Sequence, residues 1–219
     1  MWRIIAEYRP AFLEGVLVTL GLSSIVWIVG LSFGSVLGWI ANRYRGSVGL
    51  LLGLLSFLTA SIPVIVVLFW ANYPLQVLLS VVLDPFITAA CVLSLVNVVA
   101  VAAIVKSALD QFPQQFLTAA RVTGLTAGST FKNIRLPIIL RQITPSLLTS
   151  QVVMLQSTLF ASMISVQEIL RVAQAVNATE YKPVEIYSAV ALFFLVICAP
   201  INGLALFLRR RYARDFSER

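Results

Sequence analysis

The residues with the most informative types and spacing form a short polar segment in the middle of an otherwise apolar chain. They are Thr118, Ala119, Ala120 and Arg121, then Gly124, then Leu136 and Pro137. The chain has no His, and its two Cys stand in apolar stretches. General acid–base catalysis and metal binding therefore lack suitable residues, and we expect no catalytic residue and no metal. The segment is too polar to lie in hydrocarbon, which favours a docking element.

The pattern inside this segment predicts two short helices joined at a glycine. Pro113 suits the first turn of a helix that continues with good helix formers to Thr123. Gly124 is placed to end that helix in the left-handed conformation. Thr126 or Ser129 can start a second short helix, which we expect to end at the Leu-Pro pair. Two helices around a glycine corner would form a rigid projection.

A second group of polar residues lies in the apolar stretch that follows. At 100° per residue, six of them fall within an arc of about 120°. They are Gln142, Ser146, Thr149, Ser150, Gln156 and Ser157. Such a stripe should face protein or water and could line a pathway. The alternative is that these groups only hydrogen-bond to neighbouring helices or to their own backbone. None of them is ionisable, so a proton relay is not expected.

The composition shows what must position these residues. The chain is 59% hydrophobic and 11% charged, with a mean hydropathy of +0.94, and this is typical of a membrane protein rather than a soluble domain. Charges separate the apolar stretches, and a crossing helix needs roughly 20 apolar residues. We expect an all-α polytopic protein, a single membrane domain over 1–219. Its five spans would be about 12–41, 49–71, 86–108, 138–166 and 185–209, with the polar loop 113–137 between the third and fourth.

The basic residues predict the orientation. The loops after the first and third spans and the C-terminal tail hold twelve of the sixteen Lys and Arg residues and three acids, a net charge of +9. The opposite face holds four basic residues and six acids, a net charge of −2. Positive charge marks the cytoplasmic side. We expect the N-terminus outside and the C-terminus in the cytoplasm, and no nucleic-acid partner because no aromatic and basic platform is present.

Small residues indicate where helices meet. Gly30, Gly34 and Gly38 fall four apart on one face of the first expected span. This spacing lets another backbone approach closely, so we expect helix packing there, within the subunit or across a dimer. The alternative is that glycine is simply commoner in membrane helices.

The polar loop resembles a known family motif. Thr118 to Gly124 followed by Ile134 to Pro137 is similar to the EAA loop of permease subunits of bacterial ATP-binding cassette (ABC) importers, in which Glu-Ala-Ala, three residues and Gly precede Ile-x-Leu-Pro. The segments 167–174, 181–187 and 202–212 are similar to the polar amino-acid uptake permeases of the histidine, glutamine and arginine type. The resemblance covers essentially the whole chain.

The resemblance implies a type I importer permease in a bacterial cytoplasmic (inner) membrane. Two permease subunits would surround one pathway in the lipid bilayer, with two cytoplasmic ATPase subunits and an external solute-binding protein. The loop would be the coupling helix, whose ATPase-coupling residues would be the seven named first above. The chain has no glycine-rich phosphate loop, so it would not itself be an enzyme, and it would bind no cofactor. ATP and Mg²⁺ would be bound by the partner ATPase.

The chain also departs from the family pattern. Thr118 stands where the motif has Glu, Ala103 where the third span has Glu, and Gln156-Ser157 where a Lys-Asp pair is common. The segment 60–63 replaces an Arg-Gly-Thr-Pro. Charges that could hold a zwitterion are therefore missing from these positions. A zwitterion in a membrane cavity needs such charges, because burying its own charges unpaired costs several kcal/mol. We expect a non-binding half of a heterodimer, in which Gln156, Ser157 and Thr158 offer the substrate pathway only neutral hydrogen bonds.

Two other functions fit the residues alone. A channel or secondary transporter could work by itself with the polar stripe as its pore. A membrane scaffold could bind a soluble partner through the loop without transporting anything. The resemblance favours import of a polar amino acid or a related compound, and the identity of that compound stays open.

Overall fold

The structure is a computed structural model that describes residues 2–217, so Glu218 and Arg219 of the charge balance lie outside it. All elements within this range are helical. In chain order they are α1 (Trp2–Glu7), α2 (Arg9–Arg43), α3 (Val48–Ser61), α4 (Val64–Asn72), α5 (Pro74–Leu78), α6 (Pro85–Asp110), α7 (Gln114–Val122), α8 (Ala127–Thr130), the π-helix η1 (Phe131–Arg135), α9 (Leu136–Ser157), the 3₁₀-helix η2 (Thr158–Ile164), α10 (Ile169–Glu180) and α11 (Pro183–Ser217).

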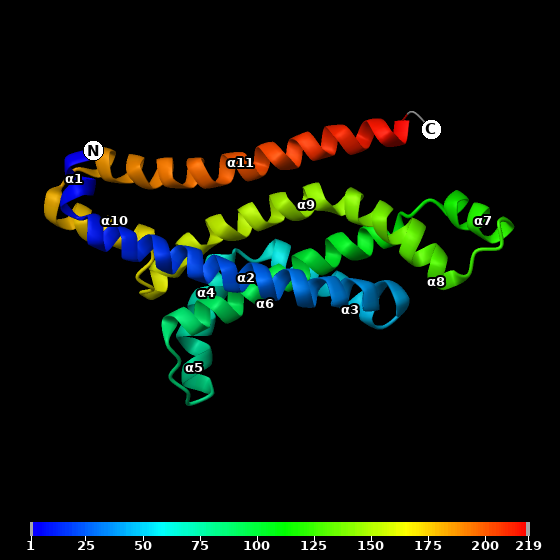
Figure 1. The fold of residues 1–219 in the computed structure, drawn as a ribbon. Coiled ribbons are helices and arrows are strands. Elements are labelled where there is room, and N and C mark those ends of the chain that lie inside the picture. The colour runs from blue at the N-terminus through cyan, green and yellow to red at the C-terminus, as the bar shows by residue number, and fades with distance from the viewer. Residues whose placement is uncertain (1, 218–219) are drawn as a thin grey trace.

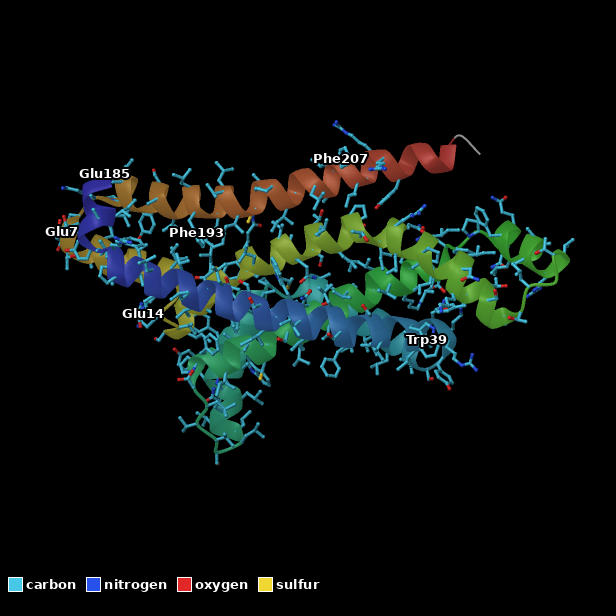
Figure 2. The ribbon with its side chains drawn as sticks, viewed as in Figure 1. Glu7, Glu14, Trp39, Glu185, Phe193 and Phe207 are labelled. Carbon is cyan, nitrogen blue, oxygen red and sulfur yellow. The ribbon has the colours of Figure 1, made fainter. Side chains whose placement is uncertain are left out.

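The helices form an elongated bundle with two distinct ends (Figure 1). α7 and α8 lie at one end, here named the loop end, together with the C-terminus of α11. α1 and α10 lie at the opposite end. Figure 2 shows Glu7, Glu14 and Glu185 near this opposite end, and Trp39 toward the loop end. Three acidic side chains therefore lie near the end opposite the loop.

Four helical segments in the described part of the chain are long and apolar enough to cross a membrane. They are Arg9–Arg43, Pro85–Asp110, Ala127–Ile164 and Pro183–Tyr212. A fifth crossing would have to be made by α3 together with α4 and α5, and this pair is bent by 96°. Each segment is apolar enough to lie in lipid, where a helix is favoured because it satisfies its own backbone hydrogen bonds.

The expectation of one uninterrupted helix over 49–71 is wrong. α3 ends at Ser61, Ile62 is extended with φ −102° and ψ 123°, and α4 begins after Pro63. Proline disfavours helical geometry in the residue before it and cannot donate the hydrogen bond that would continue the helix. The expected break at residues 72–74 is also present, because α4 ends at Asn72 and Pro74 opens α5.

The α2–α6 pair is the most extensively packed in the fold. The glycines at 30, 34 and 38 are buried on the face of α2 that meets α6. A Cβ built at Gly34 would stand 2.8 Å from the Val98 carbonyl oxygen, and one at Gly38 would stand 2.6 Å from that of Ala102. The two backbones are therefore in direct contact, which only glycine permits at these positions. The ridge is used inside this subunit.

Candidate functional site

The polar loop begins with α7, whose end has a well-defined geometry. Gly124 has φ +73°, the left-handed conformation that glycine adopts at little cost. The Leu125 N–H donates to the Ala120 carbonyl at 3.0 Å, and the Gly124 N–H donates to the Arg121 carbonyl at 3.1 Å. These two bonds form a Schellman motif, which satisfies the last carbonyls of α7. The helix bounds and the glycine corner agree with the sequence pattern.

The second helix starts where expected but does not stop where expected. The Thr126 hydroxyl accepts a hydrogen bond from the Ser129 N–H at 3.3 Å and caps α8. The helix then continues through η1 into α9, so the prediction that Leu136-Pro137 ends it is wrong. Within η1 the Leu136 N–H donates to the Phe131 carbonyl, five residues back. This wider turn shifts the hydrogen-bond register just before Pro137, where the donor is missing, and the helical segment continues without a break.

Arg135 in η1 connects this loop to the end of α6. Its Nη2 donates to the Leu109 carbonyl at 3.4 Å, and its guanidinium carbon lies 5.6 Å from the centre of the Phe112 ring. Phe112 in turn contacts Phe116 of α7, with ring centres 6.0 Å apart. The first turn of the loop and its last turn are therefore both attached to the chain at the C-terminal end of α6, at Leu109 and Phe112. The sequence motif gave no indication of this role for Arg135.

The predicted coupling residues do not share one environment. Ala120 is buried on the inner face of α7, whereas Thr118, Ala119 and Arg121 are exposed. The Thr118 hydroxyl donates to the Gln114 carbonyl of its own helix at 3.2 Å. Gly124 is exposed at the corner, and Leu136 and Pro137 stand at the start of α9. The outer face of α7, the corner and Leu136 are therefore exposed, whereas Ala120 is covered.

The polar stripe of α9 is divided in a similar way. Gln142, Ser146, Thr149 and Gln156 are exposed along one open face. Ser157 and Thr158 point into the bundle, and their hydroxyls donate to the Val153 carbonyl at 2.8 Å and the Leu155 carbonyl at 2.7 Å. Of the three residues predicted for the substrate pathway, only Gln156 is exposed.

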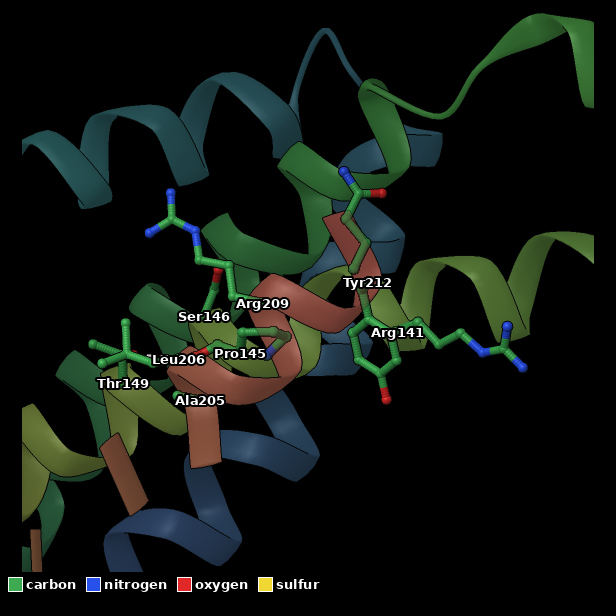
Figure 3. Close-up of a pocket in the computed structure, with 9 residues that line it drawn as sticks. Arg141, Pro145, Ser146, Thr149, Ala205, Leu206, Arg209 and Tyr212 are labelled. Carbon is green, nitrogen blue, oxygen red and sulfur yellow. Dashed lines mark hydrogen bonds between the residues drawn. The ribbon is translucent and has the colours of Figure 1, made fainter. Parts of the chain in front are cut away.

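The open face leads into a cleft between α9 and α11 at the loop end. The cleft has a volume of about 500 Å³. Its polar walls carry Gln142, Ser146 and Thr149 from α9, and Figure 3 shows Arg141, Arg209 and Tyr212 around the same space. Arg141 and Arg209 form no ion pair with residues 4–212. The cleft thus holds polar and basic side chains beside apolar residues such as Leu206, and it lies where the stripe ends.

A buried amide pair at the centre of the bundle was missed by the sequence analysis. Asn97 is fully buried and its Nδ2 donates to Gln151 Oε1 and to the Val26 carbonyl, both at 2.9 Å. Gln151 Nε2 donates back to Asn97 Oδ1 at 3.3 Å, and the Trp27 indole N–H donates to the Gln151 carbonyl at 3.0 Å. These bonds connect α2, α6 and α9. Gly30 makes room for the Asn97 side chain.

A buried acid between two candidate spans was also missed. Glu168 is fully buried and caps α10, because its Oε1 accepts the Arg171 N–H at 2.8 Å. Its Oε2 has no hydrogen-bond partner among the residues that the structure describes. Burial raises the pKa of this carboxyl to about 7. It is the only acid from residue 111 to residue 179, and this isolation in the sequence could have identified it as a candidate residue.

The chain matches known proteins over nearly its whole length. The family described as "Binding-protein-dependent transport system inner membrane component" matches residues 30–214. The glutamine transport system permease protein GlnP of Escherichia coli K12 is 28% identical over 216 residues, covering 96% of each chain. The histidine/lysine/arginine/ornithine transport system permease protein HisQ of Salmonella typhimurium is 24% identical, covering 94% of this chain and 95% of that protein.

Solved structures show the same fold. A crystal structure of an amino acid ABC transporter with histidines contains a chain with a TM-score of 0.83 and 21% identity, covering 94% of this chain and 96% of that one. An inward-facing structure of the MetNI methionine ABC transporter gives a TM-score of 0.73 at 16% identity, covering 94% and 98%. The chain belongs to the family of binding-protein-dependent transport system inner membrane components.

Proposed function

We propose that this chain is the membrane-spanning permease subunit of an ATP-driven importer of a polar amino acid or a related compound. The observation that carries this proposal is the full-length match to permease proteins of amino-acid transport systems, for glutamine, for histidine and basic amino acids, and for glutamate and aspartate. The chain forms half of a translocation pathway. Hydrolysis of ATP, with its Mg²⁺, takes place in a separate ATPase subunit.

The loop 113–137 is proposed as the contact with that ATPase. Support comes from its geometry: a capped helix, a glycine corner and a second capped helix stand at one end of the bundle (Figure 1). Both ends of the loop are attached to α6 through Phe112 and Arg135. A force on α7 would therefore move α6 and α9 as a unit, which is what a rigid-body change of access requires.

The loop end is proposed to face the cytoplasm of a bacterium and the opposite end the exterior. The basic residues Arg43, Arg45, Arg141 and Arg209 belong to the loop end, where the expected positive charge gathers. Glu7, Glu14 and Glu185 lie near the opposite end (Figure 2). The chain would lie in a bacterial inner membrane, and an external solute-binding protein would deliver the substrate at this opposite end.

This chain is proposed as the non-binding half of a heterodimer, with a second permease subunit supplying the charged substrate site. Support comes from the α9 face: from residue 142 to residue 167 the chain has no charged side chain. The hydroxyls of Ser157 and Thr158 are already bonded to their own backbone, which leaves Gln156 as the exposed member of the three, and its amide is neutral. A zwitterion needs stronger compensation than one amide can give.

Uptake by the reconstituted assembly tests both the import function and its dependence on an ATPase. The chain would be placed in proteoliposomes with its partner permease, ATPase and binding protein, and uptake of labelled amino acid would be measured with and without ATP. We expect uptake that depends strictly on ATP and on the binding protein. Uptake that persists without any ATPase would contradict the proposal and favour a stand-alone transporter.

Alanine substitutions test the non-binding half separately. We expect Gln156→Ala, Ser157→Ala and Thr158→Ala each to change uptake by less than about fivefold, because a single neutral hydrogen bond contributes about 1 kcal/mol. The same substitutions at the corresponding positions of the partner permease serve as the comparison. A loss of activity with each variant in this chain alone would show that it holds the substrate.

A further inference from the structure

The loop 113–137, which is the proposed contact with the ATPase, has an unusual charge. From residue 111 to residue 167 the sequence contains no Asp or Glu. The loop itself carries Arg121, Lys132 and Arg135. Thr118 occupies the position at which the resembling motif has Glu, so the one acid that the motif would supply is absent. The whole projection is therefore cationic, and within the loop there is no carboxylate to neutralise its guanidinium groups.

A cavity of about 350 Å³ opens in this projection, between α7 on one side and α8 with η1 on the other. Leu117, Leu125 and Phe131 form its apolar walls. Arg121 and Arg135 contribute the charges, and Thr130 contributes a hydroxyl. Apolar walls lower the local dielectric constant, so a charge interaction here is stronger than one on an open surface.

The two arginines have unused hydrogen-bonding capacity. Arg135 is held by the Leu109 carbonyl and the Phe112 ring, and its Nε is buried with no hydrogen-bond partner. Arg121 is exposed in the last turn of α7 and forms no ion pair with residues 4–212. A planar guanidinium presents its donors in a fork that matches a carboxylate. One acidic side chain could thus be met by two cations in a preformed site.

We propose that this cavity receives an acidic side chain of the ATPase, so that the ATPase groove facing this subunit carries a carboxylate opposite Arg121 and Arg135. The inference rests on the proposed function, because it names the chemistry of the partner at the same loop. It also explains how docking can work without the motif's Glu, because at this point the permease supplies the positive charges and the ATPase supplies the carboxylate.

The geometry favours a soluble protein over lipid as the occupant. Figure 1 shows α7 and α8 projecting past the turn between α2 and α3, at the tip of the loop end. The inner face of α7, with Ala120 and Phe116, packs toward the protein. Its outer face exposes the polar Gln115, Thr118 and Arg121 together with one large apolar side chain, Val122. A helix that lies on a membrane would present its apolar face outward.

Charge reversal in the intact assembly tests the inference. The tagged permease pair would be co-expressed with its ATPase, and the ATPase retained on the affinity resin would be quantified for wild type, Arg121→Glu and Arg121→Gln. We expect Arg121→Glu to reduce retention about tenfold or more and Arg121→Gln to reduce it less, because the first adds repulsion to the lost attraction. Lys132→Glu is the matched control, since it reverses a charge in the same loop but does not line the cavity.

Each outcome separates the alternatives. Rescue of Arg121→Glu by one acidic-to-Arg change in the ATPase groove would identify the paired carboxylate. Equal losses from Arg121→Glu and Lys132→Glu, with matching losses of binding to phosphatidylglycerol vesicles, would overturn the proposal in favour of lipid contact. Unchanged retention of the ATPase by Arg121→Glu would overturn the acidic contact but leave the coupling function standing. If the wild-type permease retained no ATPase, the proposed function itself would fail.

Discussion

At the scale of single residues, Asn97 and Gln151 determine how three spans are held together. Each amide is buried, and the two exchange hydrogen bonds with one another. In a membrane interior the alternative to such a pair is an unsatisfied group, which costs free energy. The sequence contained a signal that was not used, since Asn97 is the only amide in a mostly apolar span and an amide there usually has a partner.

Glu168 leads to a prediction about pH. Its pKa is about 7 in the folded protein against 4.5 for an unperturbed Glu, so the folded state binds the proton more tightly than the unfolded state. The stabilising effect of protonation is complete below about pH 4.5 and is lost as the pH rises through 7. At about 1.4 kcal/mol per pKa unit, raising the pH from 5 to 8 should lower the stability by roughly 2–3 kcal/mol.

Thermal unfolding of the detergent-solubilised protein at several pH values measures this. Glu168→Gln keeps an oxygen acceptor for the α10 cap but cannot ionise. We expect the variant to match wild type at pH 5, to be more stable at pH 8 and to show a flatter profile between them. A wild-type profile that is already flat, or a variant that keeps the full pH dependence, would contradict the role of Glu168.

At the scale of helices, the α2–α6 contact predicts which glycines are sensitive. An added methyl group at Gly38 would overlap the Ala102 carbonyl, so backbones must move apart. We expect Gly38→Ala to lower the unfolding free energy by about 1–3 kcal/mol, the usual cost of overpacking. Gly21→Ala on the same helix is the matched control, since nothing lies within 4 Å of its added Cβ. Equal stability of the two variants by thermal unfolding would show that α6 is not in close contact.

The glycine corner of the loop has an equally direct test. Gly124 has φ +73°, whereas Gly128 is helical in α8, and neither would crowd a neighbour if a Cβ were added. Gly124→Ala should strain the corner by about 1 kcal/mol and reduce ATP-dependent uptake, because the relative angle of α7 and α8 changes. Gly128→Ala should leave uptake intact and improve the local helix propensity. Uptake that is equal in both variants would argue against a rigid corner.

Local signals in the sequence predicted some elements well and others poorly. The glycine corner, the cap at Thr126 and the break at Pro74 depend on residues within one turn, so their types were sufficient. Proline was harder to interpret, because its effect depends on the backbone around it. Pro63 separates two helices by a sharp bend, whereas Pro137 is accommodated by the wide turn of η1.

The candidate site depended on contacts that no local pattern encodes. The stripe on α9 was found from its helical period, but its period could not show that Ser157 and Thr158 turn inward while Gln156 stays on the open face. The role of Arg135 depends on Leu109 and Phe112, which are more than twenty residues away. Such partners become visible only when the fold brings α6 and η1 together.

At the scale of the whole molecule, the loop, α6 and α9 form one mechanical path. Arg135 and Phe112 attach the loop to α6, and η1 runs without interruption into α9. The Asn97–Gln151 pair then joins α6 to α9 and α2 near the middle of the bundle. Movement of the loop would therefore be transmitted to the helices that border the cleft with α11. We propose that an ATPase in the cytoplasm imposes this movement.

The most direct test is site-specific cross-linking from the outer face of α7. In a background with Cys91 and Cys198 replaced by Ala, Ala119→Cys is exposed on the loop, and Ala178→Cys on α10 is the control at the opposite end. We expect the Cys at 119 to cross-link to the ATPase and to resist a membrane-impermeant maleimide added outside intact cells. We expect the Cys at 178 to be labelled by that maleimide and to form no cross-link to the ATPase. Labelling of position 119 from outside, or no cross-link within an intact assembly, would contradict the account.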